Sequence, residues 1–132
     1  DWELELSAAY QKLAHTEKQM CATQDVAHYA NHWAMLDWEF HSTLMSGCGS
    51  EIMMRTHRLA FDTFRMYSIA VFPDFGFRWE ETANEHKAIY EAAVSRDLET
   101  CLKCVEAHIA VYQGDFSTDE PLVVAKDKAR IK

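Results

Sequence analysis

Four titratable residues, Asp37, His41, His86 and His108, fall on the predicted apolar faces of three helices. Asp37 and His41 are four positions apart, so their side chains point the same way from one helix. A carboxylate or an imidazole on a buried face is costly unless a partner satisfies it. One bound metal ion would satisfy all four side chains. These residues therefore form a candidate metal site.

The two later histidines belong to a predicted helical hairpin whose turn is centred on Arg96. At ~1.5 Å per residue, His86 lies ~14 Å from this turn and His108 lies ~18 Å from it. In an antiparallel pair the two imidazoles would therefore meet at similar heights. Facing helices of a bundle can deliver metal ligands to its core in this way.

The candidate ligand set restricts the ion. Three imidazole nitrogens and one carboxylate oxygen suit zinc first, with nickel, manganese, iron and copper also compatible, and suit calcium or magnesium less well. Such a site often keeps an open position, where a small carboxylate could bind. The alternative for each histidine alone is a core residue bonded to a carbonyl group, and Asp37 could be buried against a tyrosine or an arginine.

Three arginines, Arg55, Arg58 and Arg65, lie on the third predicted helix. A guanidinium that reaches the cavity could clamp a carboxylate with two hydrogen bonds. We take Arg58 and Arg65 as candidate effector-binding residues. The alternative is a helix face that is simply solvated.

Five helices must position these side chains, because the chain holds only 4 Gly and 2 Pro and shows apolar residues at helical spacing. The pattern predicts an all-α antiparallel bundle with the metal site in its core. The third helix is apolar on most sides, which predicts a central position. The expected helices cover about residues 2–21, a segment between Asp25 as N-cap and Gly47, a segment from Ser50 as N-cap to Val71, about residues 79–94, and residues 98 to Gly114.

Length and charge limit the function classes. The 132 residues fit one compact domain, and the net charge of −8 argues against binding DNA or an anionic membrane through a broad basic patch. No apolar run reaches transmembrane length and no signal peptide is visible, so we expect a cytoplasmic protein that does not bind membranes. Cys101 and Cys104 form a C-x-x-C within a helical pattern, and we interpret them as buried or half-buried thiols, with a redox or zinc site as the alternative.

Several segments resemble one known domain. Residues 37–44, DWEFHSTL, resemble the D-x-x-F-H-x-x-L motif of the FCD domain, the ligand-sensing domain in the FadR branch of the GntR transcription regulators. Residues 85–89 resemble its E-H-x-x-I segment, and residues 92–97 resemble its A-I-x-x-G-D turn, with Arg96 in the usual glycine place. His108 and Ile109 match the closing H-I. The resemblance covers roughly residues 3 to 113.

The resemblance implies a helical bundle in which Asp37, His41, His86 and His108 are the metal ligands, as in the metal-binding members. It implies a small organic or sugar acid as effector, a homodimer, and operator DNA bound through a separate N-terminal winged helix-turn-helix domain. That domain and the first FCD helix have no counterpart here, and the chain starts at Asp1, which suggests a fragment. We assign residues 1–114 to the FCD-like domain and 115–132 to a C-terminal tail.

The leading hypothesis is therefore a non-enzymatic effector-sensing domain whose ligand modulates DNA binding. One alternative is a metal-dependent enzyme on a small helical bundle, such as a DinB-like thiol transferase or hydrolase. It would need a general base beside the open metal position, and Glu39 and Glu85 are the nearest candidates, although both fall off the inward faces. A metal-free helical interaction module is the third possibility.

Overall fold

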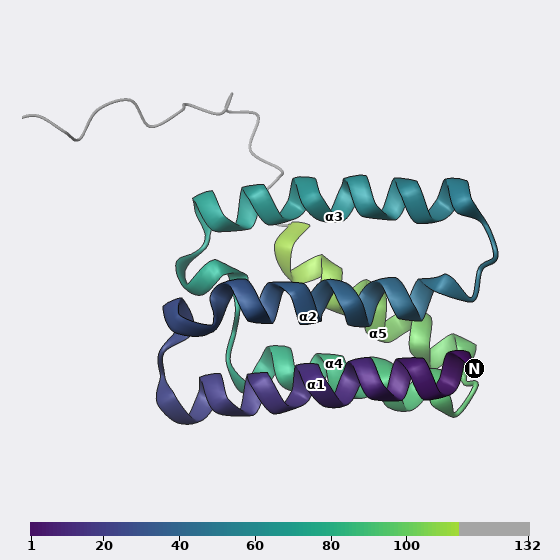
Figure 1. Cartoon of the computed structure of the whole chain (residues 1–132), viewed down its shortest axis with the longest axis horizontal. Coiled ribbons are helices and arrows are strands. Elements are labelled where there is room, and N and C mark those ends of the chain that lie inside the picture. Colours follow the sequence, from purple (N-terminus) through teal and green to yellow (C-terminus); the bar gives the residue numbers. More distant parts are fainter. Residues whose placement is uncertain (114–132) are drawn as a thin grey trace, which may run out of the picture.

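The computed structural model describes residues 1–113, apart from the side chains of Pro73, Tyr112 and Gln113. These residues form a bundle of five α-helices with one short 3-10 helix and no strand, which confirms the all-α prediction (Figure 1). Gly114 and the proposed tail lie outside the described residues. The elements are α1 (Trp2–Thr23), α2 (Val26–Ser46), α3 (Glu51–Val71), η1 (Pro73–Gly76), α4 (Glu80–Val94) and α5 (Leu98–Gln113).

The helix boundaries follow local side-chain chemistry. Asp25 caps α2 by accepting a hydrogen bond from the His28 N–H at 3.1 Å, and Ser50 caps α3 by accepting from the Met53 N–H at 3.3 Å. Both caps satisfy N–H groups that have no partner inside the helix. Helix α1 runs to Thr23, slightly beyond the predicted end, and Gln24 follows it in a left-handed conformation with φ 55°.

The turn between α4 and α5 also contains a left-handed residue. Arg96 adopts φ 60° at the position where the FCD pattern has glycine. Its guanidinium lies 4.8 Å from the ring centroid of Trp2 and 3.3 Å from the carboxylate of Glu3. The Trp2 indole N–H donates to the Thr43 carbonyl at 2.9 Å. The start of α1 is thereby joined to α2 and to the α4–α5 turn.

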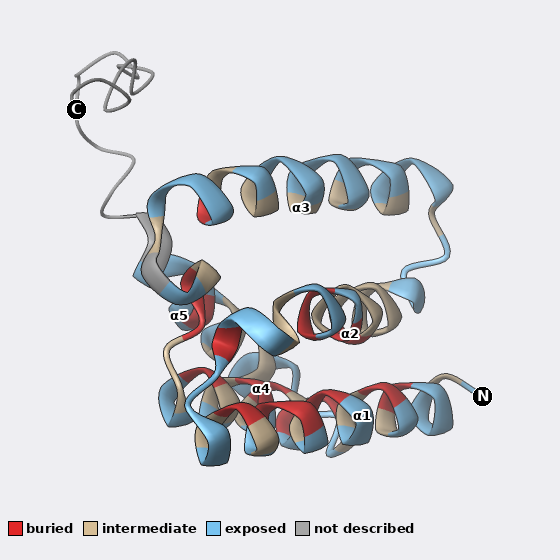
Figure 2. Cartoon of the chain, turned by 60° about the vertical axis from the view of Figure 1, so that its left-hand side comes forward, coloured by how far each residue is buried: buried red, intermediate tan, exposed pale blue. Residues whose placement is uncertain are grey.

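The core lies between α1, α2 and α4, and α5 packs against α4. Figure 2 shows the buried positions concentrated along the facing sides of these helices. The largest fully buried side chains are Phe40, Leu6, Leu13, Met20, Ile89, His86, Glu17 and Thr82. Two of these eight are titratable and lie in the middle of apolar packing, which is the feature that the functional site must explain.

Helix α3 is not central, so that prediction was wrong. Ile52, Leu59 and Met66 are 78%, 70% and 76% exposed, and Ser68 is the one described residue of α3 that is buried. The helix packs against α2 and η1 and stands apart from the rest of the bundle (Figure 2). An apolar pattern on several sides of a helix indicates that burying those side chains is favourable. It does not indicate that the surface that buries them belongs to this chain.

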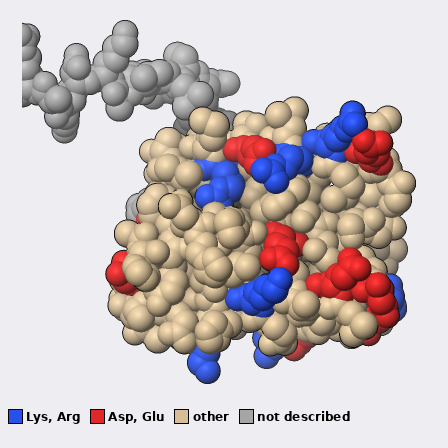
Figure 3. Space-filling view, in the orientation of Figure 1, with Lys and Arg blue, Asp and Glu red and all other residues tan. Residues whose placement is uncertain are grey.

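The surface and hydropathy agree with the expected absence of a membrane span. Within residues 1–113, no helix combines the length and the apolar character that crossing a bilayer requires. The face drawn in Figure 3 carries acidic and basic groups side by side, without a continuous basic patch.

Candidate metal centre

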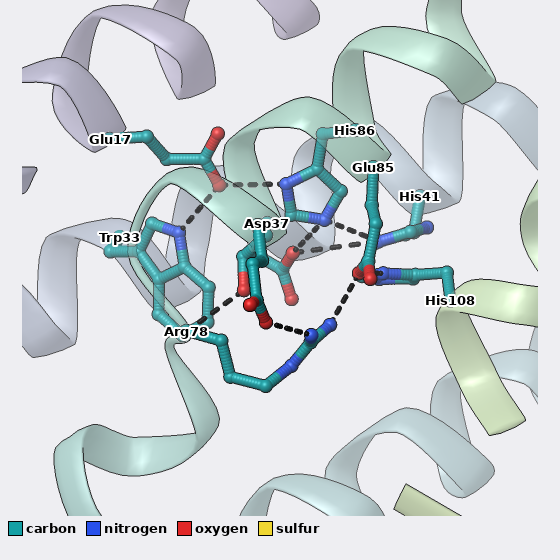
Figure 4. A network of polar contacts seen from close by, with 10 residues as sticks. Glu17, Trp33, Asp37, His41, Arg78, Glu85, His86 and His108 are labelled. Atoms are coloured by element: carbon teal, nitrogen blue, oxygen red, sulfur yellow. Dashed lines mark hydrogen bonds and ion pairs between the residues drawn. The ribbon is translucent and has the colours of Figure 1, made fainter. Parts of the chain in front are cut away.

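Three helices bring the four predicted ligands together. Asp37 and His41 come from α2, His86 from α4 and His108 from α5, and Figure 4 shows their polar atoms converging. The Nε2 atoms of His41 and His86 are 3.3 Å apart. The Asp37 Oδ1 lies 3.5 Å from the first and 3.2 Å from the second. The ligand nitrogens of the three histidines all lie within 4.8 Å of one another.

These spacings suit a transition-metal ion. A tetrahedral ion bound at ~2.1 Å places neighbouring ligand atoms ~3.4 Å apart. The distances of 3.2 to 3.5 Å among Asp37, His41 and His86 match this spacing. The ring centroid of His108 lies 4.8 Å from that of His86, so His108 is the fourth candidate ligand. The donor set of imidazoles and one carboxylate fits the same class of ion.

The buried ring of Phe40 packs against two of the candidate metal ligands. Phe40 lies between Asp37 and His41 in sequence and is fully buried. Its ring makes edge contacts with the His41 ring at 5.1 Å and the His86 ring at 5.6 Å between centroids. Because the neighbouring residue is anchored in the core, α2 cannot rotate its two polar side chains toward solvent without losing this packing.

The electrostatics favour positive charge at the centre. Burial favours the neutral His86 ring, but hydrogen bonds to Asp37 and Glu17 outweigh burial and raise the pKa of His86 to about 10. Burial also works against the Asp37 carboxylate, yet His41 and His86 hold the pKa of Asp37 well below its usual range. Burial and then the charges of His86 and His41 lower the pKa of His108 to about 4. The carboxylates of Asp37 and Glu17 thus stabilise positive charge at the position between them.

Sequence reasoning missed Glu17, a fully buried residue of α1. Its Oε1 accepts hydrogen bonds from His86 Nδ1 at 2.7 Å and from the Trp33 indole at 3.1 Å (Figure 4). The signal was present in the sequence, since Glu17 is spaced four and three positions from Leu13 and Met20 on the buried face of α1. It is the same signal that identified Asp37 and the three histidines.

A second carboxylate supports His108. Glu85 Oε2 accepts from His108 Nδ1 at 2.7 Å and from Arg78 Nη2 at 2.6 Å. Burial would raise the pKa of Glu85, but the hydrogen bonds from Arg78 and His108 lower it. Two of the three imidazoles therefore have Nδ1 bound to a carboxylate, which directs their Nε2 atoms toward the centre.

Residues 5–111 match the family model described as the FCD domain. The chain belongs to the FCD domain family. It is also 24% identical over 110 residues to BphR, an uncharacterized HTH-type transcriptional regulator of Paraburkholderia xenovorans (strain LB400). That alignment covers 83% of this chain and 43% of BphR, so the chain spans less than half of that regulator. No solved structure matches the chain.

A small cavity adjoins the metal-ligand cluster of this FCD domain. Its volume is about 40 Å³, and Asp37, His86 and His108 line it together with Arg65 and Ser68 of α3. The two candidate arginines thus differ in position. Arg65 is half-buried at the cavity, whereas Arg58 is exposed, bonds to Asp62 at 2.9 Å and lies over the Trp38 ring at 4.6 Å.

The cysteines of the FCD domain are free thiols. Cys101 and Cys104 are half-buried on α5 and pack against the core, and Cys21 is half-buried on α1. The half-buried positions of Cys101 and Cys104 confirm the prediction for this pair, and Cys48 is exposed. The histidine cluster contains no cysteine.

Replacing His57 is expected to reduce the acid sensitivity of the metal-free FCD domain. Its Nδ1 is buried without a hydrogen-bond partner among the described residues. Burial and the nearby charge of His41 lower the pKa of His57 in the folded state. The unfolded state, with a pKa of about 6.5, then binds more protons, so stability is complete above that pH and is lost as the pH falls below it.

The free energy of unfolding is measured by urea denaturation at pH 7 and pH 5, with a chelator present to keep the protein metal-free. His57→Gln should lose less stability between these pH values than the wild type. His15→Gln, which removes an exposed imidazole of α1, is the control. Equal losses for His57→Gln and the wild type would contradict the prediction.

Proposed function

We propose that this FCD domain is the effector-sensing part of a GntR-type transcription regulator of the FadR branch. It binds one divalent transition metal, zinc first, through Asp37, His41, His86 and His108, and a small organic or sugar acid beside that metal. The observation that supports this most is the 3.2 to 3.5 Å spacing of three of these ligand atoms next to a cavity that Arg65 lines.

Different residues of the site would bind the metal ion and the acid. The carboxylate and the imidazoles hold the ion, which offers an open coordination position to an oxygen of the acid. Arg65 lines the same cavity, so its guanidinium can pair with the carboxylate of the acid. The aromatic side chains of Trp33 and Phe64 also line the cavity, and an acid that displaced water from them would pair more strongly with Arg65.

Helix α3 is the element that responds to the effector. A cavity of about 40 Å³ accepts an ion and a few waters, but a sugar acid needs more room. Helix α3 forms one wall through Arg65 and Ser68 and buries little else, so its outward movement costs less than movement of α1 or α2. An acid that binds the opened state better shifts the population toward it. A separate DNA-binding domain in a homodimer would then sense the position of α3.

The structure offers little support for catalysis. Glu85 accepts hydrogen bonds from Arg78 and His108, and Glu39 accepts one from Lys12 at 2.7 Å. Both candidate general bases of a DinB-like enzyme are thus engaged in other pairs. We therefore propose binding, not turnover, as the activity of this site.

Calorimetric titration of the purified chain with zinc tests the metal site, and we expect one equivalent to bind. Acetate, lactate, succinate and gluconate are then tested by thermal shift on the zinc-loaded protein. Arg65→Gln should weaken the affinity for the acid that binds by about 10-fold or more, because a charged hydrogen bond contributes about 1.5–3 kcal/mol. Arg58→Gln is the matched control on the exposed part of the same helix. The absence of zinc binding would contradict the proposal.

A further inference from the structure

We infer that Glu17 is a positioning residue that fixes His86 for metal binding and supplies the second negative charge of the metal site. This inference rests on the metal site proposed above. Glu17 comes from α1, the helix that contributes none of the four ligands. Glu17 makes α1 part of the metal site, which thus involves four helices of the bundle.

The hydrogen bond between Glu17 and His86 selects one form of the ring. A carboxylate oxygen accepts, so His86 Nδ1 must carry the hydrogen in the 2.7 Å contact. Metal binding requires Nε2 to lose its proton, and this atom lies 3.3 Å from His41 Nε2 and 3.2 Å from Asp37 Oδ1. The ligand atom thus points to the centre of the cluster. The Trp33 indole donates to the same Glu17 oxygen at 3.1 Å and restrains its position.

The charge balance supports the same role. A divalent ion brings two positive charges into a largely buried site, and neutral imidazoles do not compensate them. Asp37 supplies one negative charge, and its contacts are with His41 and His86. Glu85 is already matched by the Arg78 guanidinium. Glu17, which is fully buried and bonded to an imidazole and an indole, supplies the second charge.

A purely structural role explains Glu17 less well. A buried carboxylate is expensive, and replacing a buried polar group by an apolar residue of similar size is often neutral for stability. One of its two oxygens, Oε2, is also buried and has no hydrogen-bond partner within residues 1–113.

The test compares Glu17→Gln and Glu17→Met with the wild type, and Glu5→Gln on the exposed side of α1 is the control. The probes are zinc and cobalt ions alone. Affinity is measured by competition with a chelator, ligand geometry by the visible spectrum of bound cobalt, and folding by the thermal midpoint of the metal-free protein.

Glu17→Gln keeps the acceptor and loses the charge, so we expect about 10-fold weaker zinc binding with a nearly unchanged metal-free midpoint. Glu17→Met loses the hydrogen-bond acceptor as well as the charge, so we expect about 100-fold weaker zinc binding and an altered cobalt spectrum. Glu5→Gln should bind zinc nearly as the wild type does, because it keeps the Glu17 carboxylate.

Wild-type affinity and an unchanged cobalt spectrum in Glu17→Gln would overturn the role of Glu17 and leave the metal site standing. If Glu17→Met does not fold, Glu17→Gln decides the question by itself. A wild-type protein that binds neither zinc nor cobalt would instead refute the metal site, and the inference about Glu17 would fall with it.

Discussion

Replacing His86 by alanine is expected to abolish metal binding and to lower the free energy of unfolding of the metal-free FCD domain by about 3–5 kcal/mol. The imidazole is fully buried and contacts Glu17 through Nδ1 and Asp37 through Nε2. Its removal takes a ligand from the centre and leaves a buried carboxylate without its main partner. Elemental analysis measures the first effect and urea denaturation the second.

His15→Ala is the matched control, because it removes an exposed imidazole from α1. It should retain one equivalent of metal and wild-type stability. If His86→Ala kept its metal, the proposed coordination by α2, α4 and α5 would be wrong. If it lost metal without any loss of stability, the contacts of Glu17 and Asp37 with this ring would contribute nothing to the metal-free fold.

The second large effect is expected for Phe40→Ala, which should lower the free energy of unfolding by about 3–5 kcal/mol. Phe40 is fully buried, and its ring contacts Tyr10 of α1 as well as His41 and His86. Alanine would leave a cavity below the metal ligands that the close-packed core cannot fully close. Thermal and urea denaturation measure the loss.

Leu59→Ala provides the control for Phe40→Ala. Leu59 belongs to the face of α3 that the sequence pattern places in the core, yet it is 70% exposed. Its replacement should change the free energy of unfolding by no more than about 0.5 kcal/mol. A loss comparable with that of Phe40→Ala would mean that α3 packs more closely than the structure shows.

Two pairings among the four candidate ligands could be predicted, because each pairing depends on short-range rules. Asp37 and His41 share a helix face by their spacing alone. His86 and His108 are placed by a tight turn, which the structure confirms at residues 95–97 between α4 and α5. In each pair the distance along the chain is short enough for helix geometry to determine it, whereas the meeting of α2 with the α4–α5 hairpin depends on packing between helices far apart in sequence.

The positions that depend on packing between distant helices could not be predicted in the same way. Arg58 and Arg65 are seven residues apart, so they share a helix face but lie ~10 Å apart along the axis. Periodicity cannot tell which of them reaches the cavity, and the structure places only Arg65 there among these two. The exposure of α3 has a similar origin, because its cover depends on surfaces far away in sequence or outside this chain.

The left-handed Arg96 shows how a local exchange affects a distant contact. A residue other than glycine in this conformation costs about 1–2 kcal/mol. Glycine would avoid that cost but has no side chain to stack on Trp2 or pair with Glu3. The strained backbone at Arg96 is therefore offset by side-chain contacts that hold the first turn of α1 against the hairpin bearing His86 and His108. Homologues with glycine at position 96 should accordingly lose the contacts with positions 2 and 3, while Trp2 keeps its hydrogen bond to the Thr43 carbonyl.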